Sequence, residues 1–386
     1  MKQGKPLADV LSELQRQNKM KRDYIAPAKA FRLEDDGETF TLKRNDGTEE
    51  MFNTTNLFHR QIGSTLEIPA KYYDQMRKRK PELLARNVNA WFGDREQNYM
   101  IRSIRSFSSM RYEEDSSNGR TAGDISPQNP SVARAVAREN LSVARALLSN
   151  RYRLIDNMEI ATDVLPLFAG QADMEVVSSA VTESHLFIKV VNHRLEQEVK
   201  PGDVVQAGVV ISNSEVGLGA VSVQPLVYRL VCSNGLIASD FGERRTHIGR
   251  TMEAADEKYS IYSDETREAE DKLLLLKLRD ATKATLEEAR FAMIVDKLRD
   301  STEARITGHV QDVIELTGKT YGLNQGEQES ILDYLIAGGD LSLYGLSNAV
   351  TRASQDSDSY DRATALESIG WQVITMPHSQ WREINQ

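Results

Sequence analysis

The segment 208–235 constrains the fold more than any other part of this sequence. It includes the end of one run rich in β-branched residues, 204–212, and all of a second, 220–232; a turn that contains Gly217 joins the two runs. Such runs, bounded by Asn and Gly, predict two adjacent buried strands. Arg229 lies within the second run and needs a partner or a route to solvent, because an unpaired buried charge is costly. Two interpretations of Arg229 stay open: a structural side chain whose stem packs on the sheet, or a group presented to an anion.

Further runs of this kind predict a central sheet around these two strands. Short polar connections between the runs favour antiparallel pairing. The additional strands are expected at 151–155, 174–181 and 184–192, with a helix at 157–168.

The N-terminal part combines helices with a small meander. Asp-Gly pairs between alternating runs are a strong hairpin signal, so residues 29–53 predict three strands. Around this meander we expect a helix at 7–22, helices at 55–62 and 69–92 with an interruption at Pro81, and a strand at 98–107.

The C-terminal part is predominantly helical. The segment 264–300 has apolar residues at helical spacing and predicts one long helix or an antiparallel pair. Either form needs a partner surface to cover Leu273 to Leu276, and another copy of the protein would supply one. The other predictions are a helix at 131–148, helical structure to about residue 320, helices near 326–337 and 359–369, and a final strand at 371–376.

These elements predict an α+β fold, with a mostly antiparallel central sheet flanked by helices. We expect an N-terminal hairpin and helix region at 1–97, a central core at 98–250 and a C-terminal helical region at 251–386. Residues 108–129 are rich in Ser, Asn, Gly and Asp and lack periodicity, which predicts a mobile loop.

Composition limits the class of protein. The chain has 386 residues, of which 40% are hydrophobic, and a single cysteine, Cys232. One cysteine excludes an intramolecular disulfide and is typical of a reducing cytoplasm. The sequence has no apolar stretch long enough to span a bilayer and no signal-peptide pattern, so we expect a cytoplasmic protein without a membrane partner.

The net charge of −9 conceals an asymmetry along the chain. Residues 60–153 contain 17 Lys/Arg and 10 Asp/Glu, a balance of +7, so the remainder carries −16. Much of that negative charge lies in 253–303. Such segregation predicts a basic surface on one part of the molecule and an acidic surface on another.

Most catalytic motifs are missing from the sequence. The histidines form no paired metal spacing, the Gly217-x-Gly219 turn lacks a third glycine, and no phosphate-binding loop or GxSxG pattern occurs. We therefore expect no cofactor, no metal and no catalytic residue. One alternative stays open, because Glu198 and Lys200, with Asp173 upstream, follow the arrangement of some metal-dependent nucleases.

Three separated blocks of sequence resemble one known family. They are SNRYRLIDN at 149–157, SNSEVGLGA with VYRLVCSNGLI between 212 and 237, and ATALESIGWQVI at 363–374. In this order they are similar to the phage/plasmid-like protein family, whose central domain has no assigned function. The resemblance implies a gene of bacteriophages and conjugative plasmids, and hence a bacterial host cell. It carries over no catalytic residues.

Basic and aromatic residues at the edges of strands, several of them adjacent pairs, are the remaining candidates for a site. A guanidinium group pairs with phosphate while an aromatic ring stacks on a base, as single-stranded nucleic acid requires. Each such pair also occurs as ordinary packing at the edge of a core. The candidate nucleic-acid-binding residues are Arg102, Arg105, Arg111, Tyr112, Arg151, Tyr152, Arg153, Tyr228, Arg229, Arg244 and Arg245.

Together these features predict a non-enzymatic, single-stranded DNA-binding protein that serves phage or plasmid recombination or replication. Strand annealing is one form of that activity, and assembly as a homo-oligomer fits it. Two alternatives remain: a protein that binds and blocks a host defence enzyme through the acidic segment 253–303, and the metal-dependent nuclease. The first would have a host protein as its partner.

Overall fold

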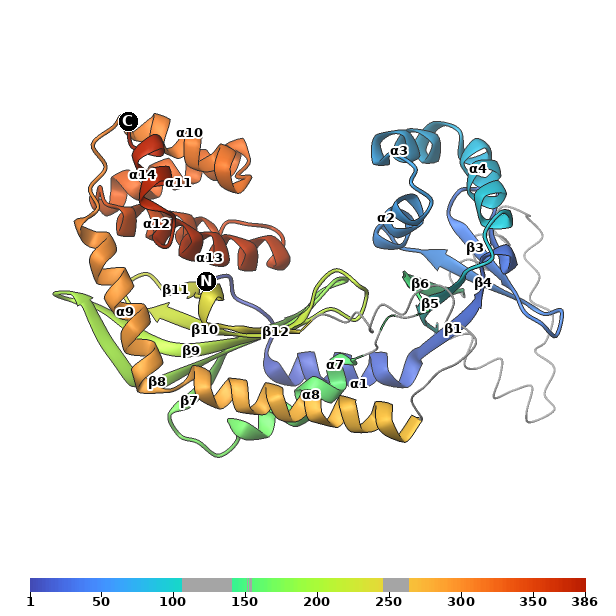
Figure 1. Cartoon of the computed structure of the whole chain (residues 1–386), viewed down its shortest axis with the longest axis horizontal. Coiled ribbons are helices and arrows are strands. Elements are labelled where there is room, and N and C mark those ends of the chain that lie inside the picture. Colours follow the sequence, from blue (N-terminus) through green and yellow to red (C-terminus); the bar gives the residue numbers. More distant parts are fainter. Residues whose placement is uncertain (106–140, 151, 153–154, 246–263) are drawn as a thin grey trace, which may run out of the picture.

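The computed structural model describes the chain except for residues 106–140, 151, 153–154 and 246–263, and it has the predicted α+β fold (Figure 1). Two sheets form in the described part of the chain, each covered by helices. The loop predicted at 108–129 and most of the strand predicted at 151–155 lie outside the described residues.

The first sheet combines the N-terminal strands with two later ones. The predicted meander is present, and its last strand pairs in parallel with β6, while the other pairings are antiparallel. In order across the sheet, the strands are β1 (Lys21–Pro27), β5 (Asn98–Ile104), β6 (Ser142–Ser149), β4 (Glu49–Thr54), β3 (Thr39–Lys43) and β2 (Phe31–Leu33). Strands from both sides of the boundary expected at 97/98 therefore share one sheet.

Strand β6 corrects the C-terminal part of the helix predicted at 131–148, while residues 131–140 of that helix lie outside the described residues. Ala and Arg favour a helix, but residues 142–149 lie between β5 and β4, where pairing on both sides satisfies their backbone groups. Ala144 and Ala146 are completely buried there. Tertiary pairing thus overrides local propensity.

Three helices cover one face of the first sheet. They are α2 (Asn56–Thr65), α3 (Ala70–Arg79) and α4 (Pro81–Gly93), with the predicted interruption at Pro81. Their core is aromatic: the Phe40 ring lies 5.0 Å from Phe58 and 6.2 Å from Phe92, both edge-on. Edge-to-face packing of this kind fixes the helices on the sheet.

The second sheet is antiparallel and contains the predicted central strands. Its order is β11 (Asn234–Ile237), β10 (Val221–Arg229), β9 (Asp203–Asn213), β8 (Leu186–Lys200) and β7 (Met174–Val181), with β12 (Glu243–Arg245) also on β10.

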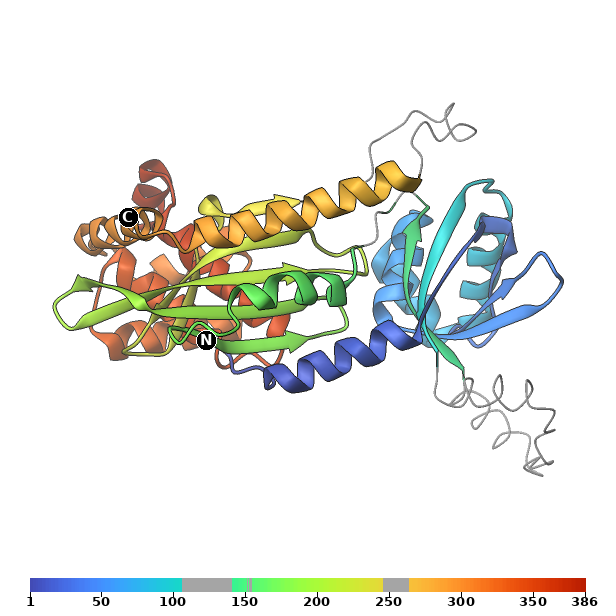
Figure 2. The ribbon, with the colours of Figure 1, turned by 90° about the horizontal axis from the view of Figure 1, so that it is seen from below.

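Helices cover both faces of this second sheet (Figure 2). On one face, α1 (Leu7–Met20), α7 (Asn157–Val164) and α8 (Asp264–Thr285) bury Val10, Ile160 and Leu278. On the other face, α9 (Glu288–Glu303), α12 (Leu343–Ala353) and α13 (Tyr360–Ile374) bury Trp371. Lys189 of β8 is fully buried and forms a 2.6 Å ion pair with Glu367 of α13, which joins this helical layer to the sheet.

The C-terminal helices differ from the sequence prediction in two places. The segment 264–300 forms neither one helix nor an antiparallel pair, because α8 and α9 bury their apolar sides against different faces of the sheet. The strand predicted at 371–376 is wrong, since Trp371 and Ile374 are one helical turn apart in α13 and enter the same core. The remaining helices are α10 (Val310–Tyr321), α11 (Gln325–Gly338) and α14 (His378–Ile384).

None of the described helices combines the length and apolar character needed to cross a membrane.

A buried histidine fixes α3 on α2. The His59 ring bonds the Thr54 hydroxyl at 2.7 Å and the Tyr73 hydroxyl at 2.8 Å, and its side chain is 2% exposed. Burial, together with the Arg77 charge, lowers the pKa of His59 to about 4, whereas Glu38 opposes this shift. His59 therefore stays neutral in the folded protein at pH values where the unfolded chain binds a proton.

This shift predicts acid sensitivity. The free energy of unfolding should fall as the pH drops from about 6.5 towards 4, and the His59 contribution to that loss should reach about 2 kcal/mol at pH 5. Urea unfolding at pH 7.5 and pH 5 checks this by comparing the wild type with His59→Gln. The variant should lose less stability on acidification; an equal loss in both proteins would contradict the assignment.

Candidate nucleic-acid interface

Arg102 lies in a buried ionic network between the two sheets. Its side chain is 1% exposed, and its guanidinium group donates to Asp156 and, at 3.2 Å, to the backbone carbonyl oxygen of Glu215, while Asp23 lies 3.4 Å away. Lys21 also pairs with Asp156. Burial alone would raise the pKa of Asp156, but the Arg102 charge and the hydrogen bonds from Lys21 and Arg102 hold it below its usual range.

The turn between β9 and β10 supplies the other half of this network. Glu215 accepts a 2.6 Å hydrogen bond from the Asn157 backbone and pairs with Arg145 of β6 at 3.1 Å. The Tyr152 hydroxyl donates to the Ser214 carbonyl oxygen at 2.9 Å. Arg102 and Tyr152, both predicted nucleic-acid contacts, are thus engaged with protein groups at the junction of the sheets.

Arg229 has a structural partner as well. Its Nε and Nη2 atoms each donate to one oxygen of Asp203 at 2.6 Å, and the Tyr344 hydroxyl donates to the same carboxylate at 3.0 Å. Its Nη1 atom also donates to Cys232 Sγ at 3.1 Å. Of the two interpretations of Arg229, this geometry supports the structural one.

The remaining predicted residues do not lie with Arg102 and Tyr152 or with Arg229. Arg105 is half-buried just after β5, Tyr228 is half-buried in β10, and Arg244 is exposed on β12. Outside the described residues lie Arg111, Tyr112, Arg151 and Arg153, and the Arg245 side chain is not described either. The described guanidinium groups therefore do not converge on one accessible groove.

Exposed cations gather instead on α3 and α4. Residues 70–93 contain six Lys/Arg and two Asp/Glu, and Arg77 is neutralised by Glu38 through bonds of 2.8 and 2.6 Å. The other five are exposed and make no ion pair with any described residue. These five, Lys71, Lys78, Arg79, Lys80 and Arg86, are called here the α3–α4 basic surface.

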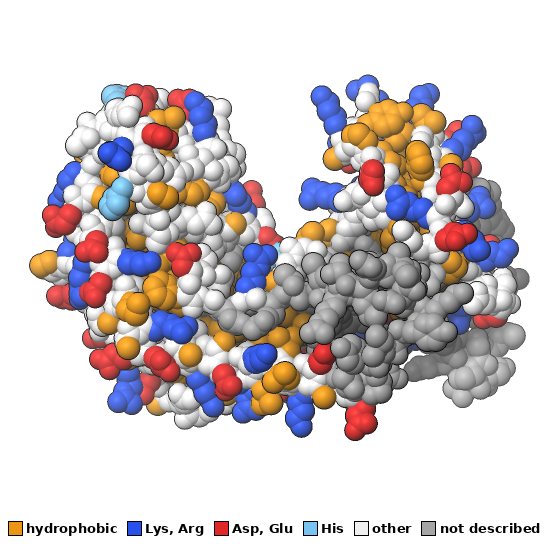
Figure 3. Space-filling model, viewed as in Figure 1, with side chains coloured by type: hydrophobic (Ala, Val, Ile, Leu, Met, Phe, Trp, Pro, Cys, Tyr) orange, Lys and Arg blue, Asp and Glu red, His pale blue; other side chains and the backbone are white. Residues whose placement is uncertain are grey.

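Exposed apolar side chains occur on the same two helices. Tyr72 is 49% exposed, Leu83 44% and Trp91 50%. Helical spacing places Tyr72 on the same side of α3 as Arg79, and Leu83 on the same side of α4 as Arg86. Figure 3 shows Lys and Arg side chains around a hydrophobic patch over α3 and α4, beside a broad hollow that separates this lobe from the C-terminal helices.

This arrangement suits a single strand of nucleic acid. Unpaired cations can bind phosphates without first breaking a salt bridge, and Tyr72 and Trp91 offer ring faces to bases. The sequence carried a signal for part of it, the run Arg77-Lys78-Arg79-Lys80 within a helix. Adjacent Arg-aromatic pairs do not reveal it, because Tyr72 and Arg79 are seven residues apart and are brought to one side of α3 by helical spacing.

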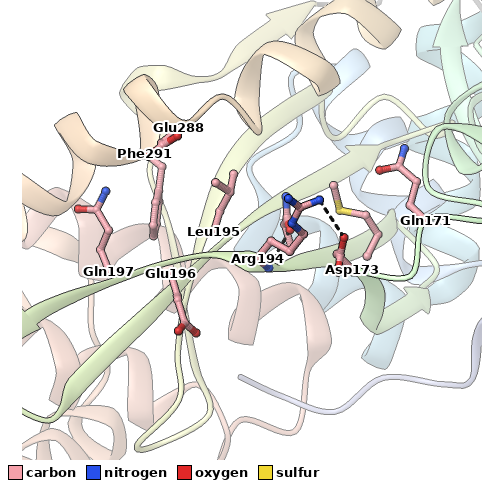
Figure 4. Close-up of a pocket in the computed structure, with 10 residues that line it drawn as sticks. Gln171, Asp173, Arg194, Leu195, Glu196, Gln197, Glu288 and Phe291 are labelled. Atoms are coloured by element: carbon pink, nitrogen blue, oxygen red, sulfur yellow. Dashed lines mark hydrogen bonds and ion pairs between the residues drawn. The ribbon is translucent and has the colours of Figure 1, made fainter.

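Two hollows near the second sheet have different chemistry. One, of about 420 Å³, lies along β8; Figure 4 shows Asp173 and Arg194, which pair at 3.5 Å, with Glu196 and Glu288 also in its wall. The other, of about 330 Å³, is lined by Arg229, Cys232 and residues of α11 and α12. Neither offers a row of free cations.

Of the residues that follow the nuclease arrangement, Lys200 is engaged with another part of the protein. Lys200 forms a 2.6 Å ion pair with Asp340 of the loop before α12. Within the described part of the chain, no group of three or more His, Cys, Asp or Glu side chains could hold a metal ion.

Comparison with known proteins identifies a family for the central part of the chain. A family described as a domain of unknown function matches residues 145–355, which span the second sheet and the helices up to α12. No curated protein and no solved structure matches the chain. The α3–α4 basic surface lies outside the matched residues.

The buried network predicts that Arg102 is needed for folding. Arg102→Met should lower the free energy of unfolding by about 3–5 kcal/mol, because it leaves Asp156 and Asp23 short of a buried partner. Urea unfolding measures this, with Arg244→Met as an exposed control expected to change stability by less than about 0.5 kcal/mol. Equal stability of the two variants would show that the network is dispensable.

Proposed function

The chain belongs to the DUF932 family of domains of unknown function, and from its geometry we propose that it binds single-stranded DNA through the α3–α4 basic surface. The observation that supports this proposal most is the group of five exposed cations that make no ion pair with any described residue, on the same two helices as the exposed rings of Tyr72 and Trp91. Electrostatic attraction to phosphates supplies most of the affinity of such surfaces, and ring stacking adds sequence-tolerant contacts.

A rigid foundation favours this use of the surface. The aromatic core under α4 and the His59–Tyr73 bond under α3 hold both helices on the first sheet. Cations on a fixed scaffold lose less conformational freedom on binding than cations on a flexible segment. The charges are therefore pre-organised for a strand.

The proposed setting is replication or recombination of a phage or plasmid in the cytoplasm of a bacterial host, as the resemblance of the sequence implies. In this role the protein would hold one strand by its phosphates and leave the bases accessible for pairing with a complement, which is the requirement for annealing. The step needs no nucleophile, nucleotide or metal.

Charge reversal tests the proposal. Lys78→Glu, Arg79→Glu and Lys80→Glu together should weaken oligonucleotide binding at least about 100-fold at low salt, and should reduce the log–log salt slope by about 2, since each phosphate contributes about 0.7. Fluorescence anisotropy with a labelled oligonucleotide measures both quantities across a salt titration.

The matched control changes three other exposed cations by the same charge. Lys5→Glu, Lys19→Glu and Arg382→Glu should retain nearly the wild-type salt slope. Absence of binding by the wild type at low salt would overturn the proposal, and an equal loss in both triple variants would reduce it to a general charge effect.

The aromatic side chains provide a separate prediction. Tyr72→Ala and Trp91→Ala should each weaken binding by about 1–3 kcal/mol with little change in the salt slope, because stacking is lost while phosphate contacts remain. Leu341→Ala removes a similarly exposed apolar side chain elsewhere and should have no effect. Unchanged affinity in both aromatic variants would restrict the surface to phosphate contacts.

A further inference from the structure

A hollow of about 330 Å³ lies between the turn that joins β10 to β11 and the helices α11 and α12. Leu335, Ala349 and Val231 give much of its wall an apolar character, and the first two are at most 3% exposed. Such a volume is near the lower end of the range for small-molecule sites, about 300–1,000 Å³. The wall is formed by residues between 200 and 352, so it lies within the matched family domain and apart from the α3–α4 basic surface.

Arg229 contributes to this wall a guanidinium group that is held in place on one side. Its Nε and Nη2 atoms are bound by Asp203, whereas its Nη1 atom donates to Cys232 Sγ at 3.1 Å. A thiol sulfur is a weak hydrogen-bond acceptor, and a carboxylate oxygen is a much stronger one for a guanidinium donor. The Nη1 side of Arg229 is therefore better suited to an anion than to the thiol.

Arg352 of α12 is the second guanidinium group in the wall. It donates to the side-chain oxygen of Gln355, a neutral amide, and its guanidinium carbon lies 5.5 Å from the centre of the Tyr334 ring. Asp356, the nearest acidic residue in the sequence, accepts a 2.7 Å hydrogen bond from the Tyr334 hydroxyl. Among the described residues, no carboxylate lies within ion-pair distance of Arg352.

The other charges of the wall are compensated. Lys200 pairs with Asp340 at 2.6 Å, and Arg229 is matched by Asp203. Arg352 thus leaves one positive charge in the hollow without a carboxylate partner in the described part of the chain.

The two guanidinium groups lie beside the same turn, because each is connected to Cys232. The thiol accepts from Arg229, and the carbonyl oxygen accepts a 3.2 Å hydrogen bond from Gln355, the residue that Arg352 contacts. We propose that the hollow binds a small aliphatic carboxylate, with its head group at the end where these two guanidinium groups lie and its chain against the apolar part of the wall.

The chemistry of the wall selects this class of ligand. One unmatched positive charge balances one carboxylate, and the planar fork of a guanidinium group matches the two oxygens of a carboxylate. A strand of nucleic acid would bring several phosphates against apolar side chains, where their charges would lose hydration without compensation. The site is therefore distinct from the DNA surface proposed above and does not depend on it.

Isothermal titration calorimetry of the full chain with octanoate tests this inference. Octanoate should bind with a Kd below about 1 mM. 1-Octanol, which has the same chain length without the charge, should bind at least about 10-fold more weakly. Acetate lacks the chain and should bind at least about 100-fold more weakly, because each buried methylene group contributes about 4-fold. No binding of octanoate up to about 10 mM, or equal binding of 1-octanol, would overturn the inference.

The guanidinium contribution has a matched control. Arg352→Met should weaken octanoate binding about 10-fold or more, since a hydrogen bond between charged groups is lost. Arg382→Met makes the same change at an exposed arginine of α14 and should leave the affinity unchanged. Thermal unfolding compares the stability of the two variants. Equal affinity of Arg352→Met and the wild type would contradict the assignment.

Cys232 reports where the ligand binds, since it is the single cysteine of the chain and lines the hollow. Octanoate at about ten times its Kd should slow the reaction of this thiol with a thiol-exchange reagent about 10-fold, because about nine-tenths of the sites are then occupied. The same octanoate concentration should slow the reaction much less in Arg352→Met. An unchanged rate in the wild type with octanoate bound would place the ligand elsewhere and overturn the inference.

Discussion

A buried ionic network joins the two sheets, and the relative position of the two lobes depends on it. Arg102 of the first sheet contacts Asp156 before α7 and the backbone of Glu215 in the β9–β10 turn, and Arg145 adds a second link to Glu215. Nonpolar packing would tolerate sliding between the two sheets, whereas directional bonds between buried charges require one arrangement. The distance between the lobes on either side of the hollow is thereby determined (Figure 3).

Sequence patterns predicted the fold well wherever local signals and tertiary structure agree. The meander, the break at Pro81 and the long strands of the second sheet all combine turn residues with strong hydrophobic periodicity. Prediction failed at residues 142–149, whose Ala and Arg favour a helix while neighbouring strands require a strand. It failed again at 371–376, where β-branched residues continue a helix because Trp371 and Ile374 fill a core beneath it. Local composition cannot reveal which neighbours a segment will have.

The candidate site was harder to predict than the fold. Arg102 and Arg229 were both candidates for a nucleic-acid contact, yet their carboxylate partners lie 54 and 26 residues away in the sequence. An arginine with a distant partner and one without any look alike until the chain is folded. The cations of α3 and α4 were visible as a basic run, but their exposure, and the absence of carboxylate partners among the described residues, are properties of the packed helices. The sequence shows the charge and spacing of these side chains, but it does not show which of them are exposed and free of carboxylate partners among the described residues.

The pair between Lys189 and Glu367 has a consequence for the order in which the chain folds during synthesis. Strand β8 emerges with a lysine in its core-facing row, and the matching carboxylate follows 178 residues later. At about 5–20 residues per second, a ribosome needs about 10–35 seconds to deliver it. Throughout that interval the second sheet has an uncovered apolar face with an unmatched ammonium group on it. The nascent protein is thus most vulnerable to aggregation after its strands are made and before α13 arrives, and this is the stage at which a chaperone would help it most.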